Sequence, residues 1–215
     1  MKLYGYFRSS CSYRVRIALN FKGIDYEQVP VNLLKNEQRS LSNLDRNPQG
    51  LVPSLEHRGK TMTQSLAIIE YLEDVFPYPP LLPQEPSQRA EVRAISQIIA
   101  CDTQPVQNLR VLKYVVNELQ NSNEDKQQWG RHFIELGFNA LESRIQDTAG
   151  TYAYGGRFSL IDVCLVPQVY NALRFNVNLE DFPVIKKVYE NSLRLTAVDL
   201  ARPEVQEDCP EGLRN

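Results

Sequence analysis

Residues 3–31 read LYGYFRSSCSYRVRIALNFKGIDYEQVPV and predict a strand, a helix and a second strand in close succession. The segment from Leu3 to Phe7 is short, apolar and rich in aromatic residues, as in a buried strand. A Ser-Ser pair then offers N-cap oxygens to a helix over residues 11–22, where apolar side chains recur with helical spacing and a glycine follows. Residues 26–31 form the second strand. Such a unit of about thirty residues predicts a right-handed crossover between parallel strands.

After the second strand the chain mixes helix and strand patterns. Residues 34–43 are polar and permissive for a helix. Residues 51–56 and 60–62 flank an Arg-Gly pair, which predicts a β-hairpin. Residues 66–76 carry apolar side chains at helical spacing. The first part of the chain therefore reads β-α-β-(α)-β-β-α.

Five prolines between residues 77 and 86 indicate a linker, because proline removes hydrogen-bond donors and stiffens the chain. Beyond the linker almost every pattern is helical. Pro105 is expected to divide the first long helical stretch, and Pro167 to bend the fourth. The tail from Pro203 is polar and is expected to fray. The predicted helices cover residues 88–101, 106–119, 125–147, 159–173, 184–193 and 197–201.

The two halves of the chain differ in periodicity, and the predicted fold class is α/β followed by all-α. A small α/β domain covers residues 1–80, and an all-helical domain covers residues 87–215, with the linker at about residues 77–86. The 215 residues suit one large or two small domains. A chain of this length buries enough surface to fold without a disulfide or a metal.

Composition and charge exclude several classes of protein. The 24 basic and 26 acidic side chains leave a net charge of −2, which argues against a nucleic-acid or anionic-membrane partner. With 42% hydrophobic residues the chain is too apolar for disorder, and no apolar run suits a membrane span or a signal peptide. Four scattered cysteines and two histidines argue against a disulfide framework and a metal site, and favour a reducing, cytoplasmic setting.

The first strand ends and the first helix begins at three residues with reactive or polar side chains, Ser9, Ser10 and Cys11. A helix N-terminus presents free N–H groups and a partial positive charge. Hydroxyl groups placed there can donate to an anion such as a thiolate, and the same setting lowers the pKa of a thiol. The alternative interpretation is that a serine only caps the helix and that Cys11 is a small buried hydrophobe. The segment alone leaves both interpretations open.

Three further motifs have both a functional and a structural interpretation. A cis peptide bond at Val52-Pro53 would leave the Val52 main chain free to pair with an extended ligand, although most such prolines are trans. Gln64-Ser65 opens a helix whose N–H groups can hold a carboxylate, although capping by Ser65 is the commoner explanation. The segment from Ser159 to Asp162 fits a capping box and is interpreted as structural.

Three arginines are candidates for binding a carboxylate. Arg8, Arg110 and Arg174 fall in different segments, and each alone is most simply a surface residue. Arg174 shares a helix face with Val163 and Tyr170, so we expect it beneath apolar neighbours. Arginine stays charged and offers a planar fork of donors, which suits a carboxylate better than lysine does.

Several motifs in this order resemble the cytosolic glutathione transferases, and more narrowly their zeta class. Residues 7–19, FRSSCSYRVRIAL, resemble the zeta signature SSCxWRVRIAL, with Tyr13 in place of the tryptophan. This motif is highly specific within the superfamily, and the resemblance runs from about residue 2 to residue 200. Further similar segments are Asn47-Pro48, Leu51-Val52-Pro53, residues 64–72, Gln104-Pro105, Gln107-Asn108, residues 165–169 and Arg174-Phe175.

The resemblance implies a thioredoxin-like N-terminal domain that binds glutathione, a helical C-terminal domain that shapes the substrate pocket, and a homodimer. Ser9 matches the thiol-activating serine of the family, and Ser10 and Cys11 complete the implied catalytic set. Arg174 matches a substrate-carboxylate arginine, with Arg8 and Arg110 as further candidates. The residues that match glutathione contacts are Ser9, Arg14, Gln38, Val52, Pro53 (expected cis), Gln64, Ser65, Gln104 and Asn108.

The zeta class implies a cis–trans isomerase that converts maleylacetoacetate to fumarylacetoacetate in aromatic amino acid catabolism, by reversible addition of the glutathione thiolate. Two alternatives stay within the fold: a maleylpyruvate isomerase, suggested by Arg110, and a transferase or dehalogenase acting on small α-halo acids. The alternative of a different class is a non-catalytic binding module, and the complete thiol site argues against it. No metal, nucleic-acid or membrane partner is expected.

Overall fold

The computed structural model describes residues 1–214 of the chain. Its main chain divides into two compact units, of which the first consists of residues 1–80 together with residues 195–214, and the second of residues 81–194. The segment 195–214, predicted as part of the second domain, therefore groups with the first unit instead. None of the helices in residues 1–214 is long and apolar enough to cross a membrane.

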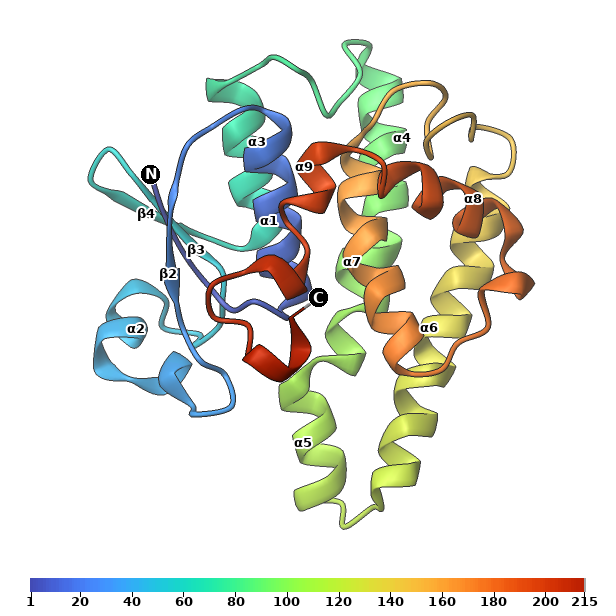
Figure 1. Ribbon diagram of the computed structural model, residues 1–215. Helices are drawn as coiled ribbons and strands as arrows, with labels where there is room; N and C mark the ends of the chain where they lie inside the picture. The colour runs from blue at the N-terminus through green and yellow to red at the C-terminus, as the bar shows by residue number, and fades with distance from the viewer. Residues whose placement is uncertain (215) are drawn as a thin grey trace. The chain divides into compact units, whose positions relative to one another are not determined.

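The first unit is built on a four-stranded mixed sheet with the strand order β2-β1-β3-β4. β1 pairs in parallel with β2 and antiparallel with β3, and β3 forms a hairpin with β4, which confirms the predicted βαβ unit and hairpin. Helices α1 (Ser10–Phe21) and α3 (Ser65–Val75) lie side by side on one face of this sheet (Figure 1). The strands are β1 (Lys2–Gly5), β2 (Glu27–Pro30), β3 (Ser54–His57) and β4 (Lys60–Thr63).

Apolar side chains of the sheet and of its two helices form the core of this unit. Leu3 of β1 and Leu55 of β3 are partners in register, and both are fully buried. Alternation along the strands sends such side chains to one face, where the helices cover them. Each fully buried aliphatic side chain stabilises the fold by roughly 1.5–3 kcal/mol. The helices contribute Val15, Ile17, Leu19, Ile68 and Leu72, all fully buried.

The predicted Arg-Gly pair forms the turn of the hairpin. Arg58 and Gly59 both have positive φ, at 52° and 73°. A two-residue type I′ turn requires positive φ at both central residues, and its twist matches that of the flanking strands. His57 therefore pairs directly with Lys60.

The stretch over residues 34–43, which the sequence indicated as permissive for a helix, does not form one continuous helix. In its place lie one 3-10 turn, η1 (Glu37–Arg39), and a short helix, α2 (Leu41–Arg46). Ser40 separates them, because its main chain is extended and its side chain accepts the N–H of Asn43 as an N-cap. A cap inside a uniformly polar stretch leaves little trace in the pattern of hydrophobicity.

The C-terminal segment folds onto the first unit, so the fraying predicted from Pro203 is wrong over residues 203–214. Asp208 accepts the main-chain N–H of Phe7 at 2.8 Å, and Cys209 is buried beside Phe7. The two partners are 201 residues apart in the chain, which is why local polarity did not reveal them. The elements of the segment are α9 (Thr196–Asp199), η5 (Pro203–Val205) and η6 (Glu211–Leu213).

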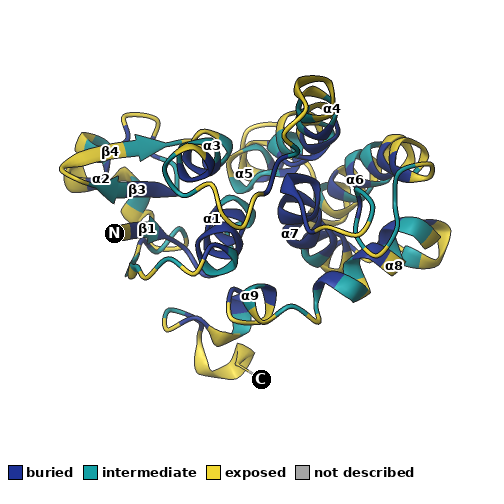
Figure 2. Cartoon of the chain, turned by 90° about the horizontal axis from the view of Figure 1, so that it is seen from above, coloured by how far each residue is buried: buried dark blue, intermediate teal, exposed yellow. Residues whose placement is uncertain are grey.

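The second unit is helical, as predicted, and α7 is its most buried helix. Residues 160–169 of α7 are all buried, and α4 and α8 pack against it (Figure 2). The first long helical stretch is divided at Pro105 as expected, since a π-helical segment follows α4 and Pro105 then begins a 3-10 turn. The elements are α4 (Pro86–Gln97), η2 (Ile98–Thr103), η3 (Pro105–Gln107), α5 (Leu109–Asn117), α6 (Asn123–Ile145), α7 (Leu160–Arg174), η4 (Leu179–Asp181) and α8 (Pro183–Ser192).

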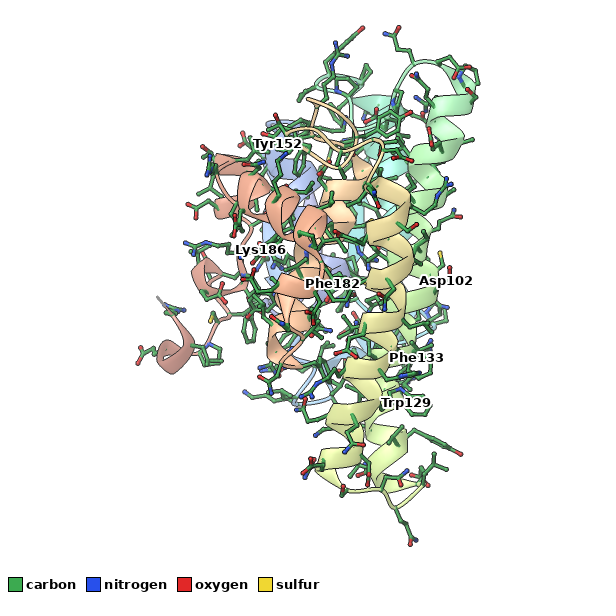
Figure 3. All side chains as sticks on the ribbon, turned by 90° about the vertical axis from the view of Figure 1, so that its right-hand side faces the viewer. Asp102, Trp129, Phe133, Tyr152, Phe182 and Lys186 are labelled. Carbon is green, nitrogen blue, oxygen red and sulfur yellow. The ribbon has the colours of Figure 1, made fainter. Side chains whose placement is uncertain are left out.

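Aromatic contacts hold the long helix α6 in the second unit (Figure 3). Trp129 lies beside Phe133 of the same helix, with ring centroids 4.9 Å apart, and its indole N–H attaches α6 to η3 by donating to the C=O of Val106 at 2.8 Å. Phe138 meets Phe182 edge-on at 5.4 Å. These contacts give Trp129 a structural role.

The capping box at the start of α7 is confirmed. Asp162 accepts both the N–H and the O–H of Ser159 at 2.8 Å, and it also accepts the N–H of Ala153 at 2.8 Å. The carboxylate is fully buried and is occupied by these three donors. Asp162 therefore stabilises the helix start, which supports the structural interpretation.

Candidate functional site

The N-terminus of α1 brings Ser9, Ser10 and Cys11 into one helical turn. Ser9 is the N-cap, and its Oγ accepts the N–H of Ser12 at 3.2 Å. A hydroxyl that accepts with a lone pair keeps its own proton for donation. The two interpretations of Ser9 are therefore compatible, since the residue caps the helix and can still donate to an anion. Ser10 and Cys11 are half-buried in the same turn.

Arg14 lies one turn further along α1 and is buried, with 1% of its surface exposed. Its Nη1 is 3.3 Å from the Oγ of Ser65 and 3.8 Å from the Sγ of Cys11. Its Nε and Nη2 are buried and have no hydrogen-bond partner within residues 1–214. A buried cation is stable only when an anion and further hydrogen bonds compensate its lost hydration. Arg14 therefore has unused donors of a kind that suits an acidic ligand.

The start of α3 faces the same arginine. Ser65 is the first residue of α3, and its hydroxyl accepts from Arg14, so the prediction that Ser65 caps the helix is wrong. The N-cap position belongs to Gln64, whose side chain makes no capping hydrogen bond. The first N–H groups of a helix without a side-chain cap are available to a ligand.

Gln64 has a strained main chain, with φ at 69° and ψ at 113°. A residue other than glycine in this region is uncommon, and such strain concentrates at sites that clamp ligands. The side chain of Gln64 is exposed and donates to the Oε1 of Gln49 at 2.7 Å. Gln64 is thus held in an unfavourable main-chain conformation at the N-terminus of α3.

Val52 and Gln38 provide two further polar groups in the first unit. The Val52–Pro53 peptide bond is cis, as predicted. Within residues 1–214 the N–H and C=O of Val52 form no hydrogen bond, so both remain for an extended ligand. The Oε1 of Gln38 is buried and has no partner within the described chain.

Four of the predicted site residues lie in the second unit. Gln104 is buried at the end of the π-helical segment. Asn108 is the N-cap of α5 and accepts the N–H of Arg110, whose side chain is exposed. Arg174 lies in the last turn of α7, and its Nη1 donates to the Oδ1 of Asn171 at 3.0 Å. The structure thus gives Asn108 a capping role. Arg174 is exposed, so the expectation that it lies beneath apolar neighbours is wrong, and its support is the hydrogen bond to Asn171.

A buried amide network supports Arg174 and escaped prediction from the sequence. Asn171 donates to the Oε1 of Gln107, and the Nε2 of Gln107 donates to the Oε1 of Gln168 at 3.1 Å. All three amides are buried. A signal was present, because polar residues recur every third position through the apolar pattern of α7, at residues 168, 171 and 174. This spacing puts them on one face of the helix.

Comparison with known proteins gives the family. The family model for the N-terminal domain of glutathione S-transferases matches residues 1–74. The maleylacetoacetate isomerase of Mus musculus is 50% identical over 214 residues, which cover 99% of this chain and 96% of that protein. Among solved structures, a bacterial maleylpyruvate isomerase of the zeta class has a TM-score of 0.95 at 39% identity, and the match covers 98% of this chain and 100% of that one.

A second solved structure is similar and holds ligands. The maleylacetoacetate isomerase of Methylobacterium extorquens AM1, with malonate and glutathione bound, has a TM-score of 0.94 at 37% identity, and the match covers 98% of this chain and 100% of that one. The resemblance carried by residues 7–19 is therefore confirmed over the whole chain. The protein belongs to the zeta class of the glutathione transferase family, the class of the maleylacetoacetate isomerases.

Proposed function

We propose that this protein catalyses the glutathione-dependent cis–trans isomerisation of maleylacetoacetate to fumarylacetoacetate. Its relatives support this activity, and the buried, incompletely paired Arg14 is the observation that carries it. Glutathione fits such a guanidinium, because it offers carboxylates and an ionisable thiol. When bound, it supplies a thiolate that adds reversibly to the double bond of the substrate and so removes the barrier to rotation.

We assign Ser9 to the sulfur of the ligand. Its O–H proton is available because its oxygen accepts from Ser12 with a lone pair. The N-terminus of α1 adds partial positive charge at the same place, and both effects favour an ionised sulfur. Ser10 and Cys11 lie in the same helical turn, and we propose that they assist Ser9 at the sulfur.

The remaining polar groups of the first unit suit the other parts of the tripeptide. Arg14 and the start of α3, with Gln64 and Ser65, match the γ-glutamyl carboxylate, because a guanidinium and free helix N–H groups both favour an anion. The main chain of Val52 matches the cysteinyl peptide groups, next to Pro53. We assign the remaining contacts, including the glycyl end, to Gln38, Gln104 and Asn108.

Arginines are assigned to the substrate, which carries carboxylates and develops negative charge on oxygen. Arg8, Arg110 and Arg174 each offer a fork of donors that stays charged. Of the three, we favour Arg174, because its guanidinium donates to Asn171 of the amide network. Preorganised donors of this kind stabilise developing charge without reorganisation during the reaction.

Maleylpyruvate is the second candidate substrate. The fold matches a maleylpyruvate isomerase with a TM-score of 0.95, and Arg110 is exposed on α5, where it is free to meet a second carboxylate. Transfer of glutathione to small α-halo acids is a third possibility within the family.

An absorbance assay with maleylacetoacetate and maleylpyruvate, each with and without glutathione, tests the proposal. We expect turnover that requires glutathione and favours maleylacetoacetate. Preference for maleylpyruvate would move the assignment to the second candidate. Release of halide from an α-halo acid without isomerisation of either keto acid would overturn it, as would binding of glutathione without any turnover.

We also propose that the protein is a cytoplasmic homodimer. The mixed-charge surface and the reduced cysteines suggested by the sequence support the compartment, and the family resemblance supports the assembly. Sedimentation equilibrium measures the assembly directly, and a mass of one chain would contradict it.

A further inference from the structure

The C-terminal segment contacts the loop that carries Ser9, and the contact is made at a single peptide group. The Oδ2 of Asp208 accepts the N–H of Phe7 at 2.8 Å. The other end of the same peptide group, the C=O of Tyr6, accepts the N–H of Ser9 at 3.0 Å. Because a peptide group is planar and rigid, the carboxylate of Asp208 helps to fix the direction in which Tyr6 holds Ser9.

Arg16 of α1 also binds this loop, through hydrogen bonds to its main chain. Its Nη2 donates to the C=O of Phe7 at 2.8 Å, its Nη1 to the C=O of Tyr6 at 3.4 Å, and its Nε to the C=O of Ala201 at 3.0 Å. Burial lowers the pKa of Arg16 to about 10, which still leaves the guanidinium charged at neutral pH. The loop is therefore held by a cation on one side and by a carboxylate on the other.

Apolar packing joins the same segment to the loop. Cys209 is buried in a cluster with Tyr6 and Phe7, and Val52 packs against this cluster. Asp208 is also held in place, since its Oδ1 accepts the Nε2 of Gln28 at 3.2 Å. The segment around Asp208 therefore packs with the loop that carries Ser9, in a cluster against which Val52 also packs. The proposed function assigns both Ser9 and Val52 to the cysteinyl part of glutathione.

We infer that Asp208 is a positioning residue for Ser9: through the Tyr6–Phe7 peptide group it sets the hydroxyl in line with the sulfur of bound glutathione. The inference rests on the proposed function. It gives the C-terminal segment a role in catalysis, although the segment contributes no group to the sulfur itself.

The direction in which the pKa of the bound thiol shifts on loss of Asp208 distinguishes a positioning role from a role through charge. A negative charge near the sulfur disfavours a thiolate, so a role through charge alone predicts that loss of Asp208 lowers the pKa of the bound thiol. A positioning role predicts the reverse, because a displaced Ser9 no longer donates to the thiolate. A purely structural role predicts a lower melting temperature and an unchanged thiol pKa.

The experiment compares Asp208→Ala, Asp208→Asn and the matched control Glu207→Ala, an exposed acidic neighbour. Thiolate absorbance of bound glutathione is titrated with pH, and kcat and KM for glutathione are measured separately. For Asp208→Ala we expect the thiol pKa to rise by about half a unit to one unit and kcat to fall about three- to tenfold, with less change in KM. Glu207→Ala should match the wild type.

Asp208→Asn keeps the test decisive if the alanine variant does not fold. The amide oxygen still accepts from Phe7, but a neutral hydrogen bond is about half as strong as a charge-assisted one. We therefore expect a smaller rise in the thiol pKa, in the same direction. A fall in the pKa, or no change in a folded variant, would overturn the inference alone. If glutathione bound to the wild type titrated like free glutathione, the proposed function and this inference would both fail.

Discussion

Arg14 and Arg16 are both buried on α1, two residues apart, and their surroundings differ completely. Arg16 donates from all three of its nitrogens to main-chain carbonyl groups of Tyr6, Phe7 and Ala201. Arg14 has a partner only for Nη1, while its Nε and Nη2 have none within residues 1–214. Two positions correspond to about 200° around a helix, so the two arginines serve opposite sides of α1.

The difference separates a residue whose hydrogen bonds are made within the fold from one that we propose to bind a ligand. Each of the three guanidinium nitrogens of Arg16 donates to the protein itself, which is the sign of a structural residue. Arg14 retains donors that the chain does not use, at the place where two helices begin. Burial alone therefore does not indicate function, whereas burial with unused donors does.

The largest effect should come from Arg16→Met, which keeps the apolar length of the side chain but removes three hydrogen bonds to main-chain carbonyl groups inside the fold. We expect the free energy of unfolding to fall by about 4 kcal/mol. Urea denaturation measures this loss. A loss below about 1 kcal/mol, the net contribution of one ordinary hydrogen bond, would contradict the structural role that the comparison gives to Arg16.

Ser9→Ala removes the hydroxyl that we assign to the thiolate. Since one oxyanion-type donor is commonly responsible for about 10²–10³ in rate, kcat should fall by that factor, with the fold retained. Cys11→Ala, in the same helical turn, is the matched control and should have the smaller effect. If Cys11→Ala abolished isomerisation and Ser9→Ala did not, the assignment of the two residues would be reversed.

Arg174→Ala extends the comparison to the second unit, where the guanidinium is held by Asn171. We expect turnover of acid substrates to fall by about a hundredfold, with little change in glutathione affinity measured by calorimetry. Asn171→Ala should give the same pattern more weakly, because it loosens the arginine without removing it. Equal loss of turnover and of glutathione binding would contradict the role of Arg174.

Arg14→Met is the counterpart of Arg16→Met and should have the smallest effect on folding. Replacing an incompletely paired buried charge by an apolar side chain of similar length should change the free energy of unfolding by less than about 1 kcal/mol. Affinity for glutathione should fall about tenfold or more, as expected for a lost charge-assisted hydrogen bond. An unfolding loss equal to that of Arg16→Met, with glutathione affinity unchanged, would remove the distinction.

The sequence predicted those parts of the site that depend on local pattern. The strand before Ser9, the helix after it and the Arg-Gly hairpin follow from periodicity and turn chemistry, and the structure confirms them. The cis bond at Pro53 was predicted from the resemblance to a family, as were the roles of Arg14, Gln38, Gln104 and Asn108, and periodicity alone would not have given them.

The parts that were missed depend on partners distant in the chain. Asp208 lies 201 residues from Phe7, and the hydroxyl of Ser65 turns to Arg14 instead of capping its own helix. The short-range exception is Ser40, which divides one polar stretch into two elements. The buried network around Asn171 was visible only as polar residues in an apolar helix. Such polar contacts are decided by tertiary packing.

The central claim is that the N-terminus of α1, with Ser9, keeps the sulfur of bound glutathione ionised at neutral pH. Titration of thiolate absorbance in the glutathione complex tests it most directly. We predict that the bound thiol of the wild type ionises well below the value of about 8.5 for a free thiol, and that Ser9→Ala brings it back towards that value. A bound thiol that titrates like a free one in the wild type, or that Ser9→Ala leaves unchanged, would contradict the account.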